Sequence, residues 1–196
     1  IPLARAVVRG SKRALIVADL PFGSYEASAE LALATSIRFF KESGVMAVKL
    51  EGAHLETVKK LVASGIPVMG HLGLTPQSMH QLGGYRVQGR TDGDAIVEAA
   101  LALEAAGAFA IVLELVPAEL AARITEALSI PTVGIGAGVN CDAQVLVWTD
   151  LMGMGKSAPK LAKAYRNLRV EMLAATKEWA DDVVGGVFPG PEQTFN

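Results

Sequence analysis

The sequence predicts an α/β fold in which parallel strands alternate with helices. Short apolar runs, most of them ending in a polar residue, alternate with longer segments of helical period. The runs are almost continuously apolar, which is typical of strands buried on both faces of a parallel sheet. Residues 44–51 (GVMAVKLE) and 107–114 (GAFAIVLE) also share the pattern G-x-x-A-x-x-L-E. Repeated strand–helix units of this kind indicate a (β/α)8 TIM barrel.

The elements follow one another in a regular order, beginning with the end of a helix at residues 1–10. The six predicted strands are ALIVAD (14–19), AVKLE (47–51), PVMGH (67–71), FAIVLE (109–114), PTVGIG (131–136) and QVLVWTD (144–150). Amphipathic segments such as 26–44 and 94–107 separate them, and each closes on a glycine, where a helix C-cap is expected. A barrel needs eight strands, so we expect six of the eight here, with the first two βα units missing from this chain.

The last third of the chain differs in character. Residues from about 157 to 184 have helical period, and the tail 185–196 is rich in glycine and proline. We therefore expect one barrel domain over residues 1–196, incomplete at its N-terminus, with this helical segment and tail at its C-terminal end. The helical segment either covers the outside of the barrel or packs at a subunit interface.

Composition excludes several functional classes. The 196 residues are 51% hydrophobic, and 18 basic against 20 acidic residues give a net charge of −2. This balance does not favour nucleic acid or an anionic membrane as a partner. No apolar run is long enough to span a bilayer, and no signal-peptide layout is visible at the N-terminus. A single cysteine, Cys141, fits a reducing compartment, so we expect a cytoplasmic protein.

Polar residues at the predicted strand ends form the candidate site. In parallel α/β sheets and barrels, ligands bind beyond the carboxyl ends of the strands. Those ends carry Asp19, Glu51, His71, Glu114 and the glycine run 134–138. Three carboxylates from three strands should therefore converge on one face. They form either a functional site or a structural network of ion pairs.

The chemistry of these residue types suggests roles. Lys49 and Glu51 lie on the same face of their strand, as a structural ion pair or as part of a site. Asp19 and Glu51 end consecutive strands and could share a hard cation such as Mg²⁺. Lys49 could then hold a substrate carboxylate, and Glu114 could remove a proton next to a metal-bound carbonyl. Spacing alone thus predicts a metal-assisted carbon-acid enzyme. His71 is either part of the substrate shell or a packed, hydrogen-bonded histidine.

Longer strings make the prediction more specific. They are VADLPFGSY, VKLEG, GHLGLTPQS, GGYRVQGR, VLELVP, IPTVGIGAG and VFPGPEQTF. This set resembles the ketopantoate hydroxymethyltransferase family from the first residues of the chain to the last. The resemblance implies a (β/α)8 barrel of the phosphoenolpyruvate/pyruvate type. It also implies transfer of a hydroxymethyl group from 5,10-methylenetetrahydrofolate to 3-methyl-2-oxobutanoate through a Mg²⁺-stabilised enolate. The product is ketopantoate, on the route to pantothenate, and the family forms homo-oligomers, decamers in bacteria.

The resemblance also implies a role for each matching residue. Asp19 becomes a Mg²⁺ ligand that also contacts the keto acid, and Glu51 a third carboxylate of the metal shell. Lys49 becomes a substrate-binding residue and Glu114 the proton acceptor. His71 is not among the residues carried over by the resemblance, and we expect it to bind the substrate because of its place at a strand end. The family's Gly-Asp-Ser motif, which supplies a further metal ligand, is not in this sequence.

Two other functional hypotheses stay open at this stage. One is a Mg²⁺-dependent 2-oxo acid lyase or mutase of the same barrel superfamily. The other is a non-catalytic chain that folds or assembles without turnover.

Overall fold

The computed structural model describes residues 1–195. These residues form two compact units, which divide between Val145 and Leu146. The first unit alternates strands with helices along the chain. Its elements are α1 (Pro2–Gly10), β1 (Val17–Asp19), α2 (Ala29–Ser43), β2 (Ala47–Lys49), α3 (Leu55–Ala63), β3 (Val68–Gly73), η1 (Pro76–Ser78), α4 (Gly93–Ala105), β4 (Ala110–Glu114), α5 (Ala118–Ala127), β5 (Thr132–Ile135) and β6 (Ala143–Gln144).

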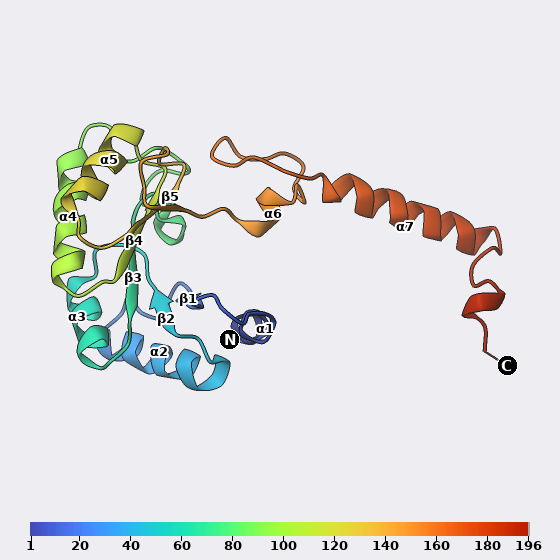
Figure 1. Ribbon diagram of the computed structural model, residues 1–196, viewed down its shortest axis with the longest axis horizontal. Coiled ribbons are helices and arrows are strands. Elements are labelled where there is room, and N and C mark those ends of the chain that lie inside the picture. The colour runs from blue at the N-terminus through green and yellow to red at the C-terminus, as the bar shows by residue number, and fades with distance from the viewer. Residues whose placement is uncertain (196) are drawn as a thin grey trace. The chain divides into compact units, whose positions relative to one another are not determined.

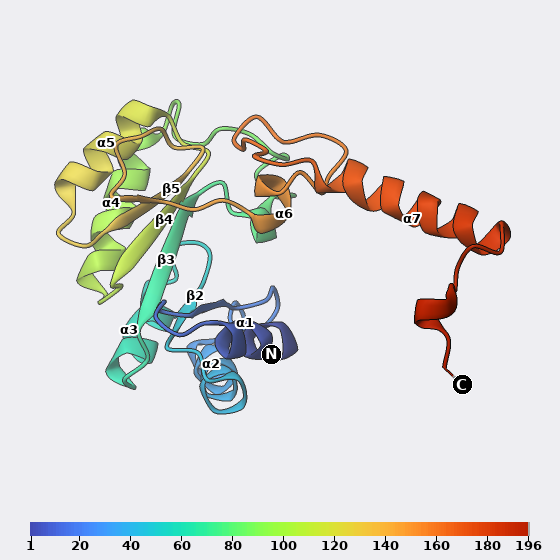
Figure 2. The ribbon, with the colours of Figure 1, turned by 45° about the vertical axis from the view of Figure 1, so that its right-hand side comes forward.

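The six strands form one parallel sheet in sequence order, β1-β2-β3-β4-β5-β6. Helices α2 to α5 pack along one side of this sheet, as both ribbon views show (Figures 1 and 2). The register places Asp19 opposite Lys49 and Gly73 opposite Glu114. The expected six parallel strands of a (β/α)8 barrel are therefore confirmed.

Local sequence signals explain where the helices begin and end. The Ser28 side chain accepts a hydrogen bond from the Leu31 N–H at the start of α2, and Gly44 ends that helix in the left-handed region. Gly107, the equivalent glycine of the internal repeat, also has a positive φ, of 98°. A Cβ at Gly107 would lie 2.9 Å from Val62, so this turn requires glycine. Among the described residues, no helix has the length and apolar character needed to cross a membrane.

The two faces of the sheet carry different residues. A Cβ at Gly70 would meet Leu103 of α4, so the outer face of β3 lies against the helices. The buried outer-face residues, all in one apolar core, are Ala18, Leu20, Val48, Leu50, Val68, Leu72, Ile111 and Leu113. Because side chains alternate along a strand, the neighbouring positions point to the other face. Polar residues at the strand ends therefore gather on the inner face, as the sequence predicted.

The sixth predicted strand is wrong over most of its length. Residues 144–150 were expected to be extended, but only Ala143–Gln144 pair with β5, and Trp148–Leu151 form a short helix, α6. β6 is the last strand of the sheet, and within residues 1–195 it has a strand neighbour on one side only. The backbone of residues 147–152 bonds locally instead: the Leu151 N–H donates to the Val147 carbonyl, and the Met152 N–H donates to the Trp148 carbonyl.

The second unit contains α6, α7 (Leu168–Val184) and η2 (Pro191–Gln193). The helix α7 begins at Leu168 rather than near residue 157, because Asn167 caps it by accepting a hydrogen bond from the Val170 N–H. The preceding residues instead make loop contacts within the unit. Tyr165 N–H, for example, donates to the Leu151 carbonyl. The helix is thus shorter than the helical period suggested.

Candidate active site

The ends of β1, β2 and β3 bring three charged or titratable side chains into contact. Lys49 Nζ lies 2.9 Å from Asp19 Oδ1 and 3.2 Å from His71 Nδ1. The Lys49 side chain is 16% exposed, whereas half of the Asp19 side chain is open to solvent. Among the ion pairs of residues 1–195, Lys49 pairs with Asp19 and not with Glu51. The simple Lys49–Glu51 pair considered from the sequence is therefore not formed.

The two glutamates of the internal repeat both face His71. The distance from His71 Nδ1 to Glu51 Oε1 is 3.9 Å, and that from His71 Nε2 to Glu114 Oε2 is 3.3 Å. The side chains of His71 and Glu51 are almost completely buried, and that of Glu114 is 13% exposed. The structure thus brings all five candidate residues into one connected cluster, with His71 at its centre.

Glu51 is held by two residues that the sequence analysis did not select. Gln77 N–H donates to Glu51 Oε2 over 2.8 Å, and the Gln77 side-chain amide donates to the Leu20 carbonyl. The buried Tyr25 hydroxyl donates to Gln77 Oε1 over 2.6 Å and accepts from the Glu51 N–H over 3.3 Å. We call Tyr25 and Gln77 the Glu51 clamp, because together they fix this carboxylate at the strand end.

Burial changes the pKa values of Glu51 and of Tyr25, one of the two clamp residues. It raises the pKa of the Glu51 carboxyl above its ordinary value, against the opposing effects of the Gln77 N–H and the Lys49 ammonium. Burial likewise raises the pKa of the Tyr25 phenol to about 12. A buried carboxylate at a strand end with a perturbed pKa is characteristic of functional sites. The sequence signal that could have identified Tyr25 is its position directly after ADLPFGS, just beyond a predicted strand end. A tyrosine at such a place can bury its ring and keep its hydroxyl among polar groups.

The backbone after β4 sets the position of Glu114. Leu115, the next residue, has a φ of 46°, in the left-handed region that non-glycine residues rarely adopt. Its N–H donates to the Ile135 carbonyl and its own carbonyl accepts from the Gln88 N–H, which stabilises this conformation. Gly73 allows β3 to approach β4, since a Cβ there would collide with the Glu114 carbonyl oxygen. The turn therefore holds Glu114 beside His71.

The carboxylates can be compared with the needs of the expected Mg²⁺ ion. Within residues 1–195, no three His, Cys, Asp or Glu side chains form a group able to hold a metal by themselves. Mg²⁺ is, however, commonly bound by one or two carboxylates together with water and substrate oxygens. Asp19 and Glu51 supply oxygen donors of this kind at neighbouring strand ends, and Glu51 is prearranged by the clamp. Their donor chemistry fits the ion.

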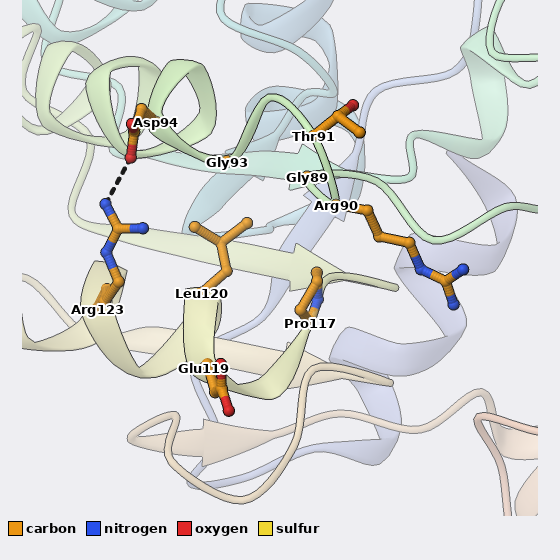
Figure 3. A pocket seen from close by; sticks show the side chains of 9 residues that line it. All are labelled: Gly89, Arg90, Thr91, Gly93, Asp94, Pro117, Glu119, Leu120 and Arg123. Atoms are coloured by element: carbon orange, nitrogen blue, oxygen red, sulfur yellow. Dashed lines mark hydrogen bonds and ion pairs between the residues drawn. The ribbon is translucent and has the colours of Figure 1, made fainter.

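A separate pocket of about 540 Å³ lies at the starts of α4 and α5. Figure 3 shows the Asp94–Arg123 ion pair on one side of it, with the Arg90 side chain extending away from that pair. Arg123 Nη2 lies 2.6 Å from Asp94 Oδ1, so the charge of Arg123 already has a partner. This pocket includes none of the five clustered residues.

Fold and site together define a class of protein. A parallel barrel sheet that gathers carboxylates, a lysine and a histidine at its strand ends belongs to the (β/α) barrel enzymes that act on small molecules at this edge. A family model described as ketopantoate hydroxymethyltransferase matches residues 1–191. The chain belongs to the ketopantoate hydroxymethyltransferase family.

Curated relatives agree with this assignment. The chain is 58% identical to a 3-methyl-2-oxobutanoate hydroxymethyltransferase of Frankia alni, over 100% of this chain and 66% of the relative. It is also 58% identical to the enzyme of the same name from Saccharopolyspora erythraea, over 100% of this chain and 68% of the relative. The chain therefore spans about two thirds of the length of these relatives.

A solved structure supports the fold. The crystal structure of a phosphonopyruvate hydrolase aligns with 98% of this chain and 68% of its own length, with a TM-score of 0.51 and 15% identity. This likeness agrees with the expected (β/α)8 barrel fold.

Proposed function

We propose that the protein transfers a hydroxymethyl group from 5,10-methylenetetrahydrofolate to C3 of 3-methyl-2-oxobutanoate, forming ketopantoate on the route to pantothenate. Water supplies the hydroxyl oxygen, and tetrahydrofolate is released when its bonds to the one-carbon unit break. The observation that carries the proposal is the strand-end cluster of Asp19, Lys49, Glu51, His71 and Glu114 in a chain that belongs to this family. The cluster brings together a cation, a candidate base and two further carboxylates. These are the groups needed to bind a 2-oxo acid and to remove a proton from it.

Each residue has a role in this proposal. The Lys49 ammonium, paired with Asp19 and near His71, would bind the substrate carboxylate at the inner face. Glu114 would accept the proton from C3, so that the C3–H electron pair can form the new bond to the one-carbon unit. Its partial burial keeps bulk water from competing for that proton.

Asp19 and Glu51 would hold the Mg²⁺ ion. When bound, the ion would polarise the keto carbonyl and stabilise the negative charge that develops when the neighbouring carbon loses its proton. The Glu51 clamp would keep one ligand oxygen in place before the ion binds.

The proposal extends to the setting of the enzyme. A chain with one cysteine and no disulfide partner within it fits the cytoplasm. We also infer a homo-oligomer, a decamer by resemblance to the family, because α7 has no buried residue and carries several exposed apolar side chains.

Exchange of tritium from C3 of 3-methyl-2-oxobutanoate tests the role of Glu114. Glu114→Gln keeps the shape and removes the basicity, so exchange and ketopantoate formation should both fall by about 10²–10⁴-fold. Binding of the keto acid, measured by calorimetry, should stay near the wild-type value. Glu119→Gln, an exposed change on α5, is the matched control and should retain full activity.

The same assay separates the remaining hypotheses. Exchange without formation of a hydroxymethylated product when folate is present would favour a lyase or mutase. No exchange by the wild-type protein would favour a non-catalytic chain. Wild-type exchange rates in Glu114→Gln would mean that another group is the base.

A further inference from the structure

The string GGYRVQGR, residues 83–90, has no role in the function proposed above. It lies in the connection between β3 and α4, residues 74–92, which we call the β3–α4 loop. The loop begins with the short helix η1 and makes hydrogen bonds beyond the ends of two strands, β2 and β4. Those two strand ends carry the candidate metal ligand and the candidate base.

The start of the loop is fastened to Glu51, just beyond the end of β2. Gln77 N–H donates to Glu51 Oε2 over 2.8 Å. The Gln77 side chain is held in turn, because the Tyr25 hydroxyl donates to its Oε1 and its Nε2 donates to the Leu20 carbonyl. Within residues 1–195 the other oxygen, Glu51 Oε1, has no hydrogen-bond partner, and His71 Nδ1 lies 3.9 Å from it. One oxygen of Glu51 therefore holds the loop, while the other is left for a ligand.

The far end of the loop is fastened beside Glu114. Gln88 N–H donates over 2.9 Å to the carbonyl of Leu115, the residue that follows Glu114. The next residue, Gly89, has a φ of 79°, and a Cβ on it would collide with Leu120 of α5. The loop thus passes too close to α5 for any other residue at this point.

The middle of the loop bonds to itself. Leu82 N–H donates to the Ser78 carbonyl, and Gly84 N–H donates to the Met79 carbonyl. These bonds follow directly after η1 and make the first half of the loop a compact turn. The loop cannot leave its place without breaking the bond to Glu51, the bond to Leu115, or both.

We propose that the β3–α4 loop positions both Glu51 and Glu114, and that Gln77 is the positioning residue that couples the loop to the metal ion. The coupling rests on the function proposed above, because it takes Glu51 as a ligand of the ion. With the loop docked, Glu51 presents Oε1 in a fixed orientation. With the ion bound at Oε1, the carboxylate would stay where Oε2 meets the Gln77 N–H.

The physical basis of the coupling is the conformational freedom of the Glu51 side chain. A side chain that one partner has already immobilised loses less freedom when the second partner binds. Coupling between two binding events is also reciprocal, so a docked loop favours the ion as much as the ion favours the docked loop. Both directions can be measured without turnover.

Hydrogen–deuterium exchange of the full-length protein tests the first direction. Saturating Mg²⁺, added alone, should slow exchange in peptides from residues 74–92 by at least about fivefold and leave peptides from α2 unchanged. Glu51→Ala should speed exchange in the loop and remove the effect of Mg²⁺. An unchanged loop in Glu51→Ala overturns the anchoring. Mg²⁺ binding to the wild type without slower exchange overturns the coupling.

Calorimetry with Mg²⁺ alone tests the reverse direction. Tyr25→Phe removes only the hydroxyl that holds Gln77, and Gln77→Met removes the amide at nearly constant size. Each should weaken Mg²⁺ binding by about 10- to 100-fold, the usual effect of losing a group that supports a metal ligand. Tyr85→Phe, the same change at an exposed position of the loop, should bind Mg²⁺ like the wild type. Wild-type affinity in both Tyr25→Phe and Gln77→Met overturns the role of Gln77.

Failure of this proposal can be told apart from failure of the proposed function. A wild type that shows the coupling but forms no ketopantoate contradicts the proposed function alone. An active wild type whose loop exchanges equally fast with and without bound Mg²⁺ contradicts the coupling alone. A wild type that binds no Mg²⁺ contradicts both the ligand role of Glu51 and the coupling, and loop exchange in Glu51→Ala then decides the anchoring.

Discussion

At the scale of single residues, the site depends on matched donors and acceptors around His71. Lys49 can only donate, while Glu51 and Glu114 can only accept when they are ionised. The buried imidazole lies within 3.9 Å of both carboxylates and 3.2 Å of the ammonium. A substitution at any of these positions therefore changes the hydrogen bonding of its neighbours as well as its own charge.

Glu51 should make stability depend on pH. Burial raises the pKa of its carboxyl above the ordinary value of 4.5. A group with a raised folded-state pKa contributes its full stability below the unfolded-state pKa, and that contribution is lost as pH rises through the folded-state pKa. In metal-free buffer, Glu51→Gln should therefore have a higher Tm than the wild type near neutral pH. The difference should vanish once the pH falls below the unfolded-state pKa.

Thermal unfolding in the presence of a chelator measures this effect. Glu104→Gln provides a control of opposite sign, because hydrogen bonds from Ser129 lower the pKa of the Glu104 carboxyl. Glu104→Gln should have a lower Tm than the wild type near neutral pH, and this difference should shrink at acid pH. Added Mg²⁺ should raise the Tm of the wild type more than that of Glu51→Gln, since the variant lacks one ligand charge. A wild-type protein that is the more stable of the two without metal would contradict the prediction.

At the scale of elements, the close approach of β3 and β4 brings His71 and Glu114 together. Gly73 has a φ of 90°, and a Cβ on it would meet the Glu114 carbonyl and Val116. Gly65 has a similar φ of 82°, but a Cβ on it would meet nothing within 4 Å. The two glycines therefore separate the cost of backbone conformation from the cost of crowding.

Gly73→Ala should destabilise the fold more than Gly65→Ala does. The left-handed backbone costs an alanine roughly 1–2 kcal/mol at either position. Crowding against a backbone carbonyl at Gly73 should add about 1–3 kcal/mol more. The free energy of unfolding in urea measures both losses, and equal losses in the two variants would show that β4 moves to accommodate the methyl group.

At the scale of the whole molecule, the long helix α7 has an exposed apolar surface. Met172, Trp179 and Val183 lie on one stripe of the helix and are 46%, 54% and 45% exposed. Large apolar side chains gathered on one helix surface often mark a contact with another chain. We expect this stripe to pack between subunits of the proposed homo-oligomer.

Trp179→Glu should weaken that assembly. Loss of a buried tryptophan at an interface costs about 2 kcal/mol or more, which corresponds to at least about thirtyfold weaker association. Light scattering should show a mass that falls toward the 20.5 kDa of one chain as the variant is diluted. Glu178→Gln, on the same helix, should keep the wild-type mass. An unchanged mass for Trp179→Glu would exclude this stripe from the interface.

Most of the fold could be predicted because its signals are local. Five of the six strands and the helices between them follow from apolar runs, helical period and capping residues such as Ser28 and Gly44. The sixth strand could not, since residues 145–150 have the same apolar character as a strand. In the structure their backbone groups bond locally in a helical turn, with the Leu151 N–H on the Val147 carbonyl. The start of α7 was misplaced because the Asn167 cap is a weaker signal than the helical period around it.

The sequence by itself determined the order of the elements, their parallel pairing and the polar residues at the strand ends. These depend on neighbours a few positions apart, whose periodicity decides which face each side chain takes. Tertiary structure alone decided that Lys49 pairs with Asp19, that His71 lies between Glu51 and Glu114, and that Tyr25 and Gln77 clamp Glu51. Lys49 and His71 are 22 positions apart, and Tyr25 and Gln77 are 52 apart. Such contacts form only when the sheet brings distant strand ends together, so no local pattern encodes them.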